Sequence, residues 1–375
     1  MVLLIGNYPL DRQQSMQRFG TMMLQGLTAG GVAAELIAPR PFFGNFSSAG
    51  SFVAKWLGYI DKFVLFPRRL RSKLAQGPSI VHICDHSNAM YDGQIGGVPV
   101  VVTCHDLLAV RGALGEETNC PASFTGKILQ RWILRGLRRA TLIACDSQAT
   151  YDDALRLVRH DSDSPKIEVV TLGLNYPYLK LQETETSARL AEVPRFNREL
   201  PFILHVGSNL RRKNRDGVLR IFARCKDKWN GRLVFAGDLL DPELMSLVEK
   251  LGVSDRVTQL KDPTNDLLEA LYNRAVALMY PSRFEGFGWP IIEAQACGCP
   301  VICSNSGPLP EAAGDAGLFH DVDDEEGFAA DLLRLTDPTE RARWSEKSLR
   351  NAERFSTDKM ISRYIDIYRS LGAQL

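Results

Sequence analysis

Short apolar runs alternate with segments of helical periodicity along the whole chain. Between the first two runs, Met16, Phe19 and Met23 recur at the spacing of one helix face. Such alternation is typical of parallel strands joined by crossover helices, and it predicts an α/β fold with doubly wound sheets. The strands that we expect in the first half lie near Val2–Ile5, Ala34–Ala38, Ile80–Ile83, Val98–Thr103, Thr141–Cys145 and Ile167–Thr171.

The alternation stops at residues 182–199, which are rich in Glu, Thr, Ser and Arg, and then starts again. The sequence therefore predicts two Rossmann-like domains, at residues 1–181 and 201–356, joined by a linker at 182–200. A last amphipathic segment, residues 357–375, is expected to form a helix that crosses back to the first domain. The strands expected in the second half lie near Phe202–Val206, Leu233–Ala236, Val257–Leu260, Val276–Tyr280 and Val301–Cys303.

Composition narrows the class of protein. The formal net charge of +1 argues against a protein that binds nucleic acid through bulk electrostatics. Several of the eight cysteines stand in apolar runs, and Cys297-Gly298-Cys299 lacks the usual spacing of a metal site, so we expect buried, reduced cysteines. Neither a signal peptide nor an apolar run long enough to span a bilayer is visible, so we expect a cytoplasmic protein, either free or peripheral at the inner face of the membrane.

The segment that follows the strand Val276–Tyr280 carries the strongest functional signal. A glycine-rich loop, Glu285–Trp289, leads into a helix that is expected at Pro290–Cys297. The free amides and the positive dipole end of a helix N-terminus make a binding site for anions, and phosphate groups in particular. Pro290 has no amide hydrogen, which leaves the amides of Trp289, Ile291 and Ile292 free for such a site.

Two carboxylates flank this loop, Glu285 before it and Glu293 inside the helix. A carboxylate beside a diphosphate is suited to accept hydrogen bonds from sugar hydroxyls, as the acidic residue of dinucleotide-binding folds does. The alternative for Glu293 is that it only complements the helix dipole.

A basic run follows the first strand of the second domain. Gly207 ends this strand, and Arg211, Arg212 and Lys213 come shortly after it. Cations fixed at the carboxyl end of a strand can stabilise the charge that develops on a leaving diphosphate. The alternative is a solvated surface, which is the usual environment of such a run.

These residues together resemble the retaining glycosyltransferase family 4, whose members have the GT-B fold. Glu285 and Glu293, with Gly286-Phe287-Gly288 between them, match the family's E-x7-E signature. The run from Glu293 to Ile302 and the segment Leu309–Ala316 also match, and they resemble bacterial mannosyl, O-antigen and exopolysaccharide transferases. The resemblance is strong over the second domain and weaker over the first.

The resemblance implies a role for each matching position. Glu285 would contact the donor sugar, Glu293 the ribose, and the amides near Gly288, Trp289 and Ile291 the diphosphate. The family's Arg/Lys pair matches Arg212 and Lys213, although Ser208 stands where many members have arginine and leaves Arg211 as an alternative to Arg212. His105 would contact the sugar from the acceptor side, and Asp106 would orient or cap. The remaining nucleotide-site candidates are Gly207, Gly237, Lys261, Asp262, Leu267, Gly286 and Phe287.

Other segments give weaker signals. In the opening loop, Gln14 and Ser15 are candidates for contact with the phosphates and the acceptor. Phe52–Leu74 is apolar and basic, and is predicted to be either an interfacial or acceptor-lipid helix or an ordinary core helix with a solvated basic end. Two segments have the spacing of the DxD metal motif of other glycosyltransferases, Asp321-Val322-Asp323 and Asp161-Ser162-Asp163. Neither follows a glycine-rich strand end, so we discount both as metal sites.

The resemblance implies a retaining, metal-independent hexosyltransferase without a cofactor, and no residue is evident as the nucleophile of a covalent intermediate. The donor would be GDP-mannose, with a UDP-hexose second, and the acceptor a glycan or a lipid-linked saccharide. Three alternatives stay open: a sugar-nucleotide epimerase, a phosphorylase, and a catalytically silent sugar-nucleotide-binding scaffold. An epimerase should lack the Glu285–Glu293 pair, and a phosphorylase would need a pyridoxal lysine. The presence of both glutamates and of the basic run that includes Arg212 and Lys213 argues against a silent scaffold.

Overall fold

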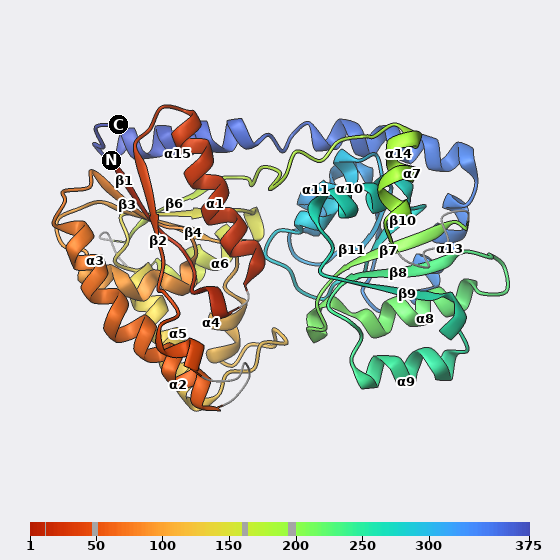
Figure 1. Ribbon diagram of the computed structural model, residues 1–375, viewed down its shortest axis with the longest axis horizontal. Helices are drawn as coiled ribbons and strands as arrows, with labels where there is room; N and C mark the ends of the chain where they lie inside the picture. The colour runs from red at the N-terminus through yellow and green to blue at the C-terminus, as the bar shows by residue number, and fades with distance from the viewer. Residues whose placement is uncertain (12, 47–51, 160–163, 194–199) are drawn as a thin grey trace. The chain divides into compact units, whose positions relative to one another are not determined.

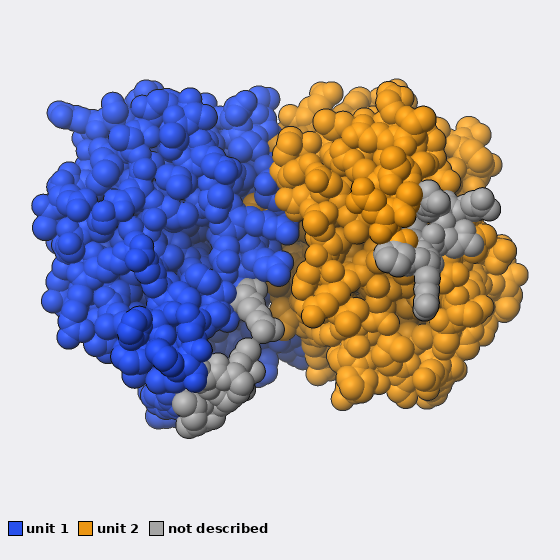
Figure 2. Space-filling view, in the orientation of Figure 1, with its two compact units in different colours: residues 1–175, 356–375 blue, residues 176–355 orange. Residues whose placement is uncertain are grey.

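The computed structural model describes residues 1–11, 13–46, 52–159, 164–193 and 200–375, and leaves the side chains of residues 52–55 undescribed. The chain divides into two compact units (Figure 2). Unit 1 contains residues 1–175 and 356–375, and unit 2 contains residues 176–355. Each unit has a parallel six-stranded sheet with helices packed against it (Figure 1).

The sheet of unit 1 has the strand order β2-β1-β3-β4-β5-β6, and every neighbouring pair is parallel. Its strands are short, and the four central ones are fully buried, as expected for strands that are covered on both faces. The strands are β1 (Val2–Ile5), β2 (Ala34–Ile37), β3 (Ile80–Ile83), β4 (Val100–Cys104), β5 (Leu142–Cys145) and β6 (Lys166–Val169).

The helices of unit 1 connect these strands. Ser123 and Ser147 cap the N-termini of α5 and α6 through their hydroxyl oxygens. The α-helices are α1 (Gln14–Ala29), α2 (Phe52–Ile60), α3 (Phe66–Leu74), α4 (Leu108–Ala113), α5 (Phe124–Leu137), α6 (Gln148–Val158) and α15 (Thr357–Ser370). Shorter elements are η1 (Pro9–Asp11), η2 (Phe43–Phe46), the π-helical turn η3 (Asp61–Leu65) that joins α2 to α3, and η4 (His86–Gln94).

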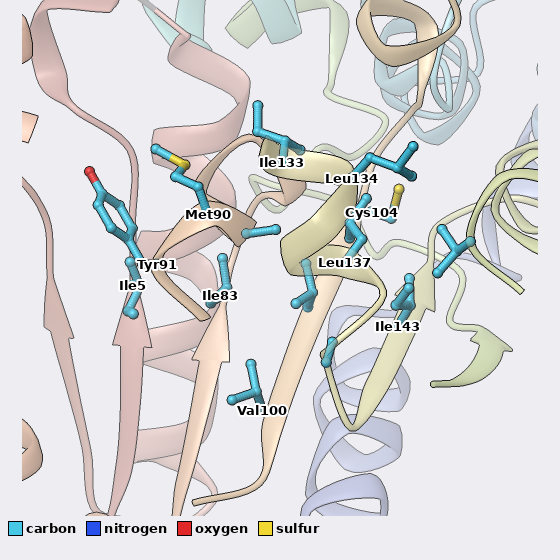
Figure 3. Close-up of a cluster of buried hydrophobic side chains, with 14 of the residues drawn as sticks. Ile5, Ile83, Met90, Tyr91, Val100, Cys104, Ile133, Leu134, Leu137 and Ile143 are labelled. Atoms are coloured by element: carbon cyan, nitrogen blue, oxygen red, sulfur yellow. The ribbon is translucent and has the colours of Figure 1, made fainter. Parts of the chain in front are cut away.

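One face of the unit 1 sheet packs against α3, α5 and η4. Successive side chains of a strand point to opposite faces, so Ile5 and Ile83 reach this side together. They join a buried apolar cluster that includes Tyr91 from η4 and Leu137 from α5 (Figure 3). This cluster is the core that fixes the carboxyl ends of β1, β3, β4 and β5.

The other face of this sheet is covered by α1 and α15. His82 of β3 lies fully buried, with Nδ1 2.6 Å from the Tyr368 hydroxyl and Nε2 2.8 Å from the Thr103 hydroxyl. The Thr103 hydroxyl is also 2.7 Å from that of Tyr364. Burial lowers the pKa of His82 to about 3, so this histidine is a neutral core residue. The last helix of the chain is therefore part of the first unit's core.

The sheet of unit 2 has the order β12-β11-β10-β7-β8-β9 and is also parallel throughout. Helices α8, α9 and α13 contribute side chains to one buried cluster against it, and α10 and α11 contact β7, β10 and β11. Its strands are β7 (Phe202–Gly207), β8 (Arg232–Gly237), β9 (Val257–Lys261), β10 (Ala277–Tyr280), β11 (Val301–Ser304) and β12 (Gly317–His320).

Side-chain caps define the starts of several helices in unit 2, through Asp241 for α9, Thr264 for α10, Asp324 for α13 and Asp337 for α14. The α-helices are α7 (Glu183–Ala191), α8 (Arg215–Cys225), α9 (Pro242–Leu251), α10 (Asn265–Arg274), α11 (Trp289–Ala296), α12 (Leu309–Ala313), α13 (Glu325–Leu335) and α14 (Pro338–Ala352). Three short helical turns complete the unit: η5 (Arg211–Lys213), η6 (Ser254–Arg256) and η7 (Gly314–Ala316).

The structure corrects the predicted domain boundaries. The chain leaves unit 1 after Asn175 rather than after residue 181, and it returns at Ser356. The predicted linker, residues 182–200, contains α7, which packs on α10 inside unit 2, while residues 194–199 lie outside the described part. Arg189 of α7 donates to the buried Glu269 carboxylate at 2.6 Å, so a polar segment is held by an ion pair that sequence pattern does not reveal.

The apolar pattern of the sequence does not predict β12. The strand has only two strongly apolar residues, Leu318 and Phe319, and lies at the edge of the sheet, where it pairs with β11 alone. Tertiary pairing therefore creates this strand. Helix α8 begins at Arg215, and the polar side chains of Arg215 and Asp216 stand in its first turn.

Candidate functional site

The cations and the first carboxylate predicted from the sequence meet in unit 2. The Glu285 carboxylate accepts from Arg212 Nη1 and from Lys213 Nζ, both at 2.6 Å. The Tyr280 hydroxyl donates to the same carboxylate at 2.8 Å and lies 2.8 Å from Lys213 Nζ. We call Arg212, Lys213, Tyr280 and Glu285 the charge cluster.

The backbone places the charge cluster at the carboxyl ends of two neighbouring strands. Tyr280 is the last residue of β10, and Glu285 lies in the loop that follows it. Arg212 and Lys213 form the turn η5, which follows β7 and ends at Asn214 in a left-handed conformation, with φ at 54°. The Asn214 side chain donates to the Pro281 carbonyl at 3.0 Å, which ties the two loops together.

Electrostatics keep Glu285 ionised. Burial by itself would raise its pKa, but Lys213 and Arg212 outweigh this effect and lower it to about 2. Burial also lowers the pKa of Lys213, although Glu285 opposes that shift. The cluster thus holds two cations around one carboxylate, and both carboxylate oxygens already accept hydrogen bonds.

The structure decides between the adjacent arginines. Arg212 contacts Glu285 and also donates to the Phe284 carbonyl at 3.0 Å. Arg211 is exposed, and no ion pair involves it within the described ranges. Arg212 and Lys213 are therefore the pair that geometry brings to Glu285.

Helix α11 starts four residues after Glu285. Its N-cap, Gly288, has a φ of 105°, and a Cβ there would lie 2.9 Å from the Leu309 side chain, so both backbone and packing require glycine. No side chain caps this helix. The amide of Ile291, which the sequence predicted to face a diphosphate, donates to the Gly288 carbonyl at 2.9 Å and so is already bonded. The side chains of Ile291, Trp289 and Phe287 are buried, and the Phe287 ring packs edge-on against Phe355.

Glu293 lies on the same helix and is bound by a different partner. Its side chain is buried, and the Tyr272 hydroxyl of α10 donates to Glu293 Oε2 at 2.9 Å. Its carboxylate therefore has a fixed orientation set by a neighbouring helix.

Three of the predicted nucleotide-site residues, Gly207, Gly237 and Lys261, lie in register at the carboxyl edge of the sheet. Gly207 of β7 pairs with Gly237 of β8, and the amide of Asp262, just after β9, donates to the Gly237 carbonyl at 3.1 Å. A Cβ on Gly237 would lie 2.2 Å from the Gly207 carbonyl oxygen, so the two strand ends approach too closely for any other residue. Asp262 has a positive φ of 42°, and Leu267 is half-buried in the first turn of α10.

Four residues that sequence reasoning missed help to build this site. Tyr280 and Tyr272 bind the two glutamates, as described above. Arg215 is buried and donates to Asn209 Oδ1 at 2.6 Å and to the Asp238 carbonyl at 2.8 Å, which joins the loops after β7 and β8. His205 stacks on Tyr280 and is kept neutral by burial, which lowers its pKa to about 3. Tyr280 had a signal, its place at the end of a strand, whereas the other three have none.

In unit 1 the predicted His105 is buried at the end of β4. Its Nδ1 lies 3.1 Å from Asp146 Oδ2, and its Nε2 lies 3.0 Å from the Cys84 carbonyl oxygen. Burial raises the pKa of Asp146 to about 7, and Asp146 in turn raises the pKa of His105. Both ring nitrogens thus have partners within the chain, and the sugar contact of His105 stays a prediction. Asp106 Oδ1 accepts a hydrogen bond at 3.0 Å from the amide of Leu108, the first residue of α4.

The remaining candidates have structural surroundings. Gln14 and Ser15 are exposed in the first turn of α1. Asp323 pairs with Arg283 at 3.0 Å, while Asp161–Asp163 lies outside the described residues. Seven of the eight cysteines are buried. Within the described ranges, no group of three His, Cys, Asp or Glu side chains could hold a metal ion, and no helix is long and apolar enough to cross a membrane.

Comparison with known proteins identifies the family. The model for "Glycosyl transferases group 1" matches residues 187–350, and the model for "Glycosyltransferase Family 4" matches residues 16–176. The D-inositol 3-phosphate glycosyltransferase of Rhodococcus jostii is 30% identical over 321 residues, which are 80% of this chain and 69% of that protein. O-antigen chain mannosyltransferase B of Escherichia coli is 32% identical over 236 residues, which are 58% of this chain and 62% of that protein, less than two thirds of its length.

Solved structures show the same fold. Sucrose-phosphate synthase from Thermosynechococcus elongatus superposes with a TM-score of 0.78 at 20% identity, and 99% of each chain is covered. HepE from Anabaena, in complex with UDP and glucose, gives 0.74 at 16% identity, with 98% of this chain and 99% of that chain covered. The fold is therefore GT-B, and the chain belongs to the GT-B glycosyltransferases of the family 4 type. This assignment favours transfer over the epimerase and phosphorylase alternatives.

Proposed function

We propose that this glycosyltransferase is a retaining hexosyltransferase that uses a nucleoside-diphosphate sugar and needs neither a metal ion nor a cofactor. The observation that carries the proposal is the charge cluster of unit 2. Arg212 and Lys213 are held by one buried, ionised carboxylate at the carboxyl ends of β7 and β10. Ligands of open α/β sheets bind at such strand ends.

The two cations suit a departing diphosphate. As the bond between the sugar and the diphosphate breaks, negative charge grows on the diphosphate oxygens, and fixed cations stabilise that growth. Glu285 holds Arg212 and Lys213 side by side at the strand ends, where both cations could face the diphosphate. The N-terminus of α11, which no side chain caps, adds a positive dipole end to the same loop.

The carboxylates would recognise sugar hydroxyls. Glu285 stays ionised over the physiological pH range, so it acts as a hydrogen-bond acceptor and is a poor general acid. We assign it to the hexose and Glu293 to the ribose, each oriented by a tyrosine hydroxyl. Gly207, Gly237, Asp262 and Leu267 would lie along the nucleotide.

The proposed reaction proceeds with departure and attack on the same face of the sugar. The anomeric carbon–oxygen bond to the diphosphate breaks, an acceptor hydroxyl oxygen bonds to the anomeric carbon, and the hydroxyl proton passes to the leaving diphosphate. The transition state resembles an oxocarbenium ion. Glu285 is unsuited to be a covalent nucleophile, because both of its oxygens are bound by Arg212, Lys213 and Tyr280.

The preferred donor in this proposal is GDP-mannose, with a UDP-hexose as the second candidate. The first is supported by the E. coli relative, which is named a mannosyltransferase, and the second by the Anabaena structure with UDP and glucose. The acceptor would be a glycan or a lipid-linked saccharide, and the proposed place of action is the cytoplasm, at the inner face of the membrane.

A donor screen tests this proposal. The full chain is incubated with GDP-mannose, UDP-glucose and UDP-N-acetylglucosamine, each with and without saccharide acceptors, and release of nucleoside diphosphate is measured. We expect turnover with one donor class, and an anomeric configuration in the product, read by NMR, that matches the donor. An inverted product would refute the retaining mechanism. Undiminished turnover after removal of the Glu285 carboxylate would refute the site, and a chain that binds no nucleotide would refute the function.

A further inference from the structure

An exposed apolar row runs along the helix that α2, η3 and α3 form together in unit 1. Trp56, Ile60 and Val64 stand four residues apart and are 51%, 37% and 45% exposed. The backbone stays helical through the joints at Ile60 and Phe66, so this spacing brings the three side chains close to one face. Arg68, four residues further on, is also exposed and continues the row.

Helix α5 presents a second row with the same spacing. Phe124, Ile128 and Trp132 are 80%, 52% and 44% exposed, while the opposite side of the helix contributes buried residues such as Leu137 to the core. The Trp132 ring stacks on Phe63 of η3, with centroids 5.4 Å apart and an angle of 27° between the planes. The two rows are therefore neighbours on one surface, which we call the basic-aromatic face.

The charge on this surface has one sign. Lys127, Arg131 and Arg135 are exposed along α5, a helix without any acidic residue, and no ion pair involves them among the described residues. Residues 52–74 contain one acid, Asp61, which is buried. Its carboxylate accepts from the Tyr8 hydroxyl at 2.7 Å and from the amide of Gly44 at 3.0 Å, so it adds little negative potential to the surface.

Not every cation nearby is free. Lys62 pairs with Asp11 at 3.0 Å, and Lys73 pairs with Glu35 at 2.7 Å. The unpaired charge therefore lies on α5 and near Arg68, directly beside the apolar rows. In a chain whose formal net charge is only +1, this concentration is a local feature of one face.

Six large apolar side chains are exposed on two adjacent helices, and exposed apolar patches of this kind mark interaction sites. Trp and Phe on one side, Lys and Arg beside them, and no exposed acid on either helix are the pattern of helices that lie in a membrane interface. A bilayer that contains anionic lipids complements both the apolar rows and the charge. We propose that the basic-aromatic face docks unit 1 on an anionic membrane surface. This inference does not depend on the donor site of unit 2.

Vesicle flotation tests the proposal with the full chain. One set of vesicles is phosphatidylcholine with phosphatidylglycerol, and the other is phosphatidylcholine alone. We expect the protein to float with the anionic vesicles and to stay behind with the neutral ones. High salt should reduce binding, because screening shortens the reach of the cations.

Two variants and a matched control locate the surface. Arg131→Glu with Arg135→Glu should lower the partition to anionic vesicles about tenfold or more, since each cation near such a surface contributes on the order of 1 kcal/mol. Ile128→Ser with Trp132→Ser should also weaken it. Lys228→Glu with Lys250→Glu makes the same charge change on exposed positions of unit 2 and should leave the partition unchanged. Circular dichroism and nucleoside diphosphate release with a soluble acceptor, compared with the unaltered chain, show whether each variant is folded.

Three results would overturn the proposal. The first is the absence of binding to anionic vesicles by the folded chain. The second is an equal loss of binding in the control variant. The third is a concentration-dependent dimer, seen by sedimentation, that the Ile128→Ser and Trp132→Ser changes dissociate, because the face would then serve a second copy of this chain.

Discussion

At the scale of single residues, the charge cluster shows how two cations set the ionisation of one carboxylate. Glu285 is ionised because Arg212 and Lys213 contact it, and the two cations tolerate each other because Glu285 lies between them. A bound diphosphate would compete with Glu285 for these cations. On the proposed function, the carboxylate would therefore limit how tightly the product nucleoside diphosphate is held.

This competition gives a first prediction. Glu285→Gln removes one negative charge from contact with two cations, an interaction of a few kcal/mol at an effective dielectric near 20. We expect GDP or UDP to bind about tenfold tighter or more by calorimetry, while turnover falls by about two orders of magnitude or more. Glu325→Gln is the matched control, because Glu325 also pairs with two arginines, Arg220 and Arg224, away from the cluster. Weaker nucleotide binding in Glu285→Gln would contradict this role.

A second prediction concerns acid stability. The pKa of Glu285 is about 2 in the folded chain and 4.5 without the cluster. A carboxyl group whose pKa is depressed by folding stabilises the native state above the unfolded value and loses this effect as pH falls through the folded value. We expect the free energy of unfolding of unit 2 to fall by a few kcal/mol between about pH 4.5 and pH 2 on account of Glu285. The free energy of unfolding is measured by denaturant titration at a series of pH values. It should fall less between about pH 4.5 and pH 2 in Glu285→Gln than in Glu325→Gln, and an equal fall in both variants would refute the assignment.

Some residues of the candidate site can be predicted from the sequence and others cannot. Glu285, Glu293, Arg212 and Lys213 could be found because they stand at strand ends, in a glycine-rich loop or at a helix start. Tyr272 could not, because its position in α10 looks like an ordinary core position and only packing brings its hydroxyl to Glu293. Whether these residues bind a sugar nucleotide stays a prediction.

At the scale of elements, the close approach of two helices explains why a glycine stands inside helix α1. Helix α1 contacts α15, and a Cβ on Gly26 would lie 2.5 Å from Ile361 Cγ1. Ile361 is buried and branched at Cβ, so it has little room to move away. The glycine therefore permits this contact, although glycine is unfavourable inside a helix.

Gly26→Leu should accordingly destabilise unit 1. We expect a loss of about 1–3 kcal/mol, because the added side chain overpacks the contact between α1 and α15. The measurement is the free energy of unfolding of unit 1, followed by urea denaturation. Gly96→Leu serves as a control in the same unit, because a Cβ at Gly96 would meet no atom within 4 Å. A variant at Gly26 as stable as this control would contradict the packing argument.

At the scale of the whole molecule, the order of the chain and the order of its units differ. The chain forms most of unit 1, then all of unit 2, and returns to unit 1 with residues 356–375. Both chain ends meet on one residue, since the N-terminal amine lies 3.3 Å from the Ser79 hydroxyl, which is 3.2 Å from the Gln374 carbonyl oxygen. Unit 1 is therefore complete only when the last helix is present.

A chain truncated after Phe355 tests this organisation. Loss of α15 removes the partners of the buried His82 and Thr103, and uncovers one face of the first sheet. We expect unit 1 to lose its cooperative unfolding transition, because unsatisfied buried polar groups and lost apolar burial act together. Unit 2 contains the whole charge cluster, so its affinity for GDP or UDP should be retained by calorimetry. Loss of nucleotide binding with unit 1 intact would contradict the division into units.

The sequence by itself determined the alternation of strands and helices, the two parallel sheets, the family, and most of the charged candidates, because these depend on local periodicity and on short motifs. The tertiary structure decided what depends on partners distant in the chain. It placed α7 in unit 2 through the Arg189–Glu269 pair, created β12 by pairing with β11, and engaged the ring nitrogens of His105 with Asp146 and Cys84. It also chose Arg212 over Arg211, because only the fold shows which of two adjacent cations lies against Glu285.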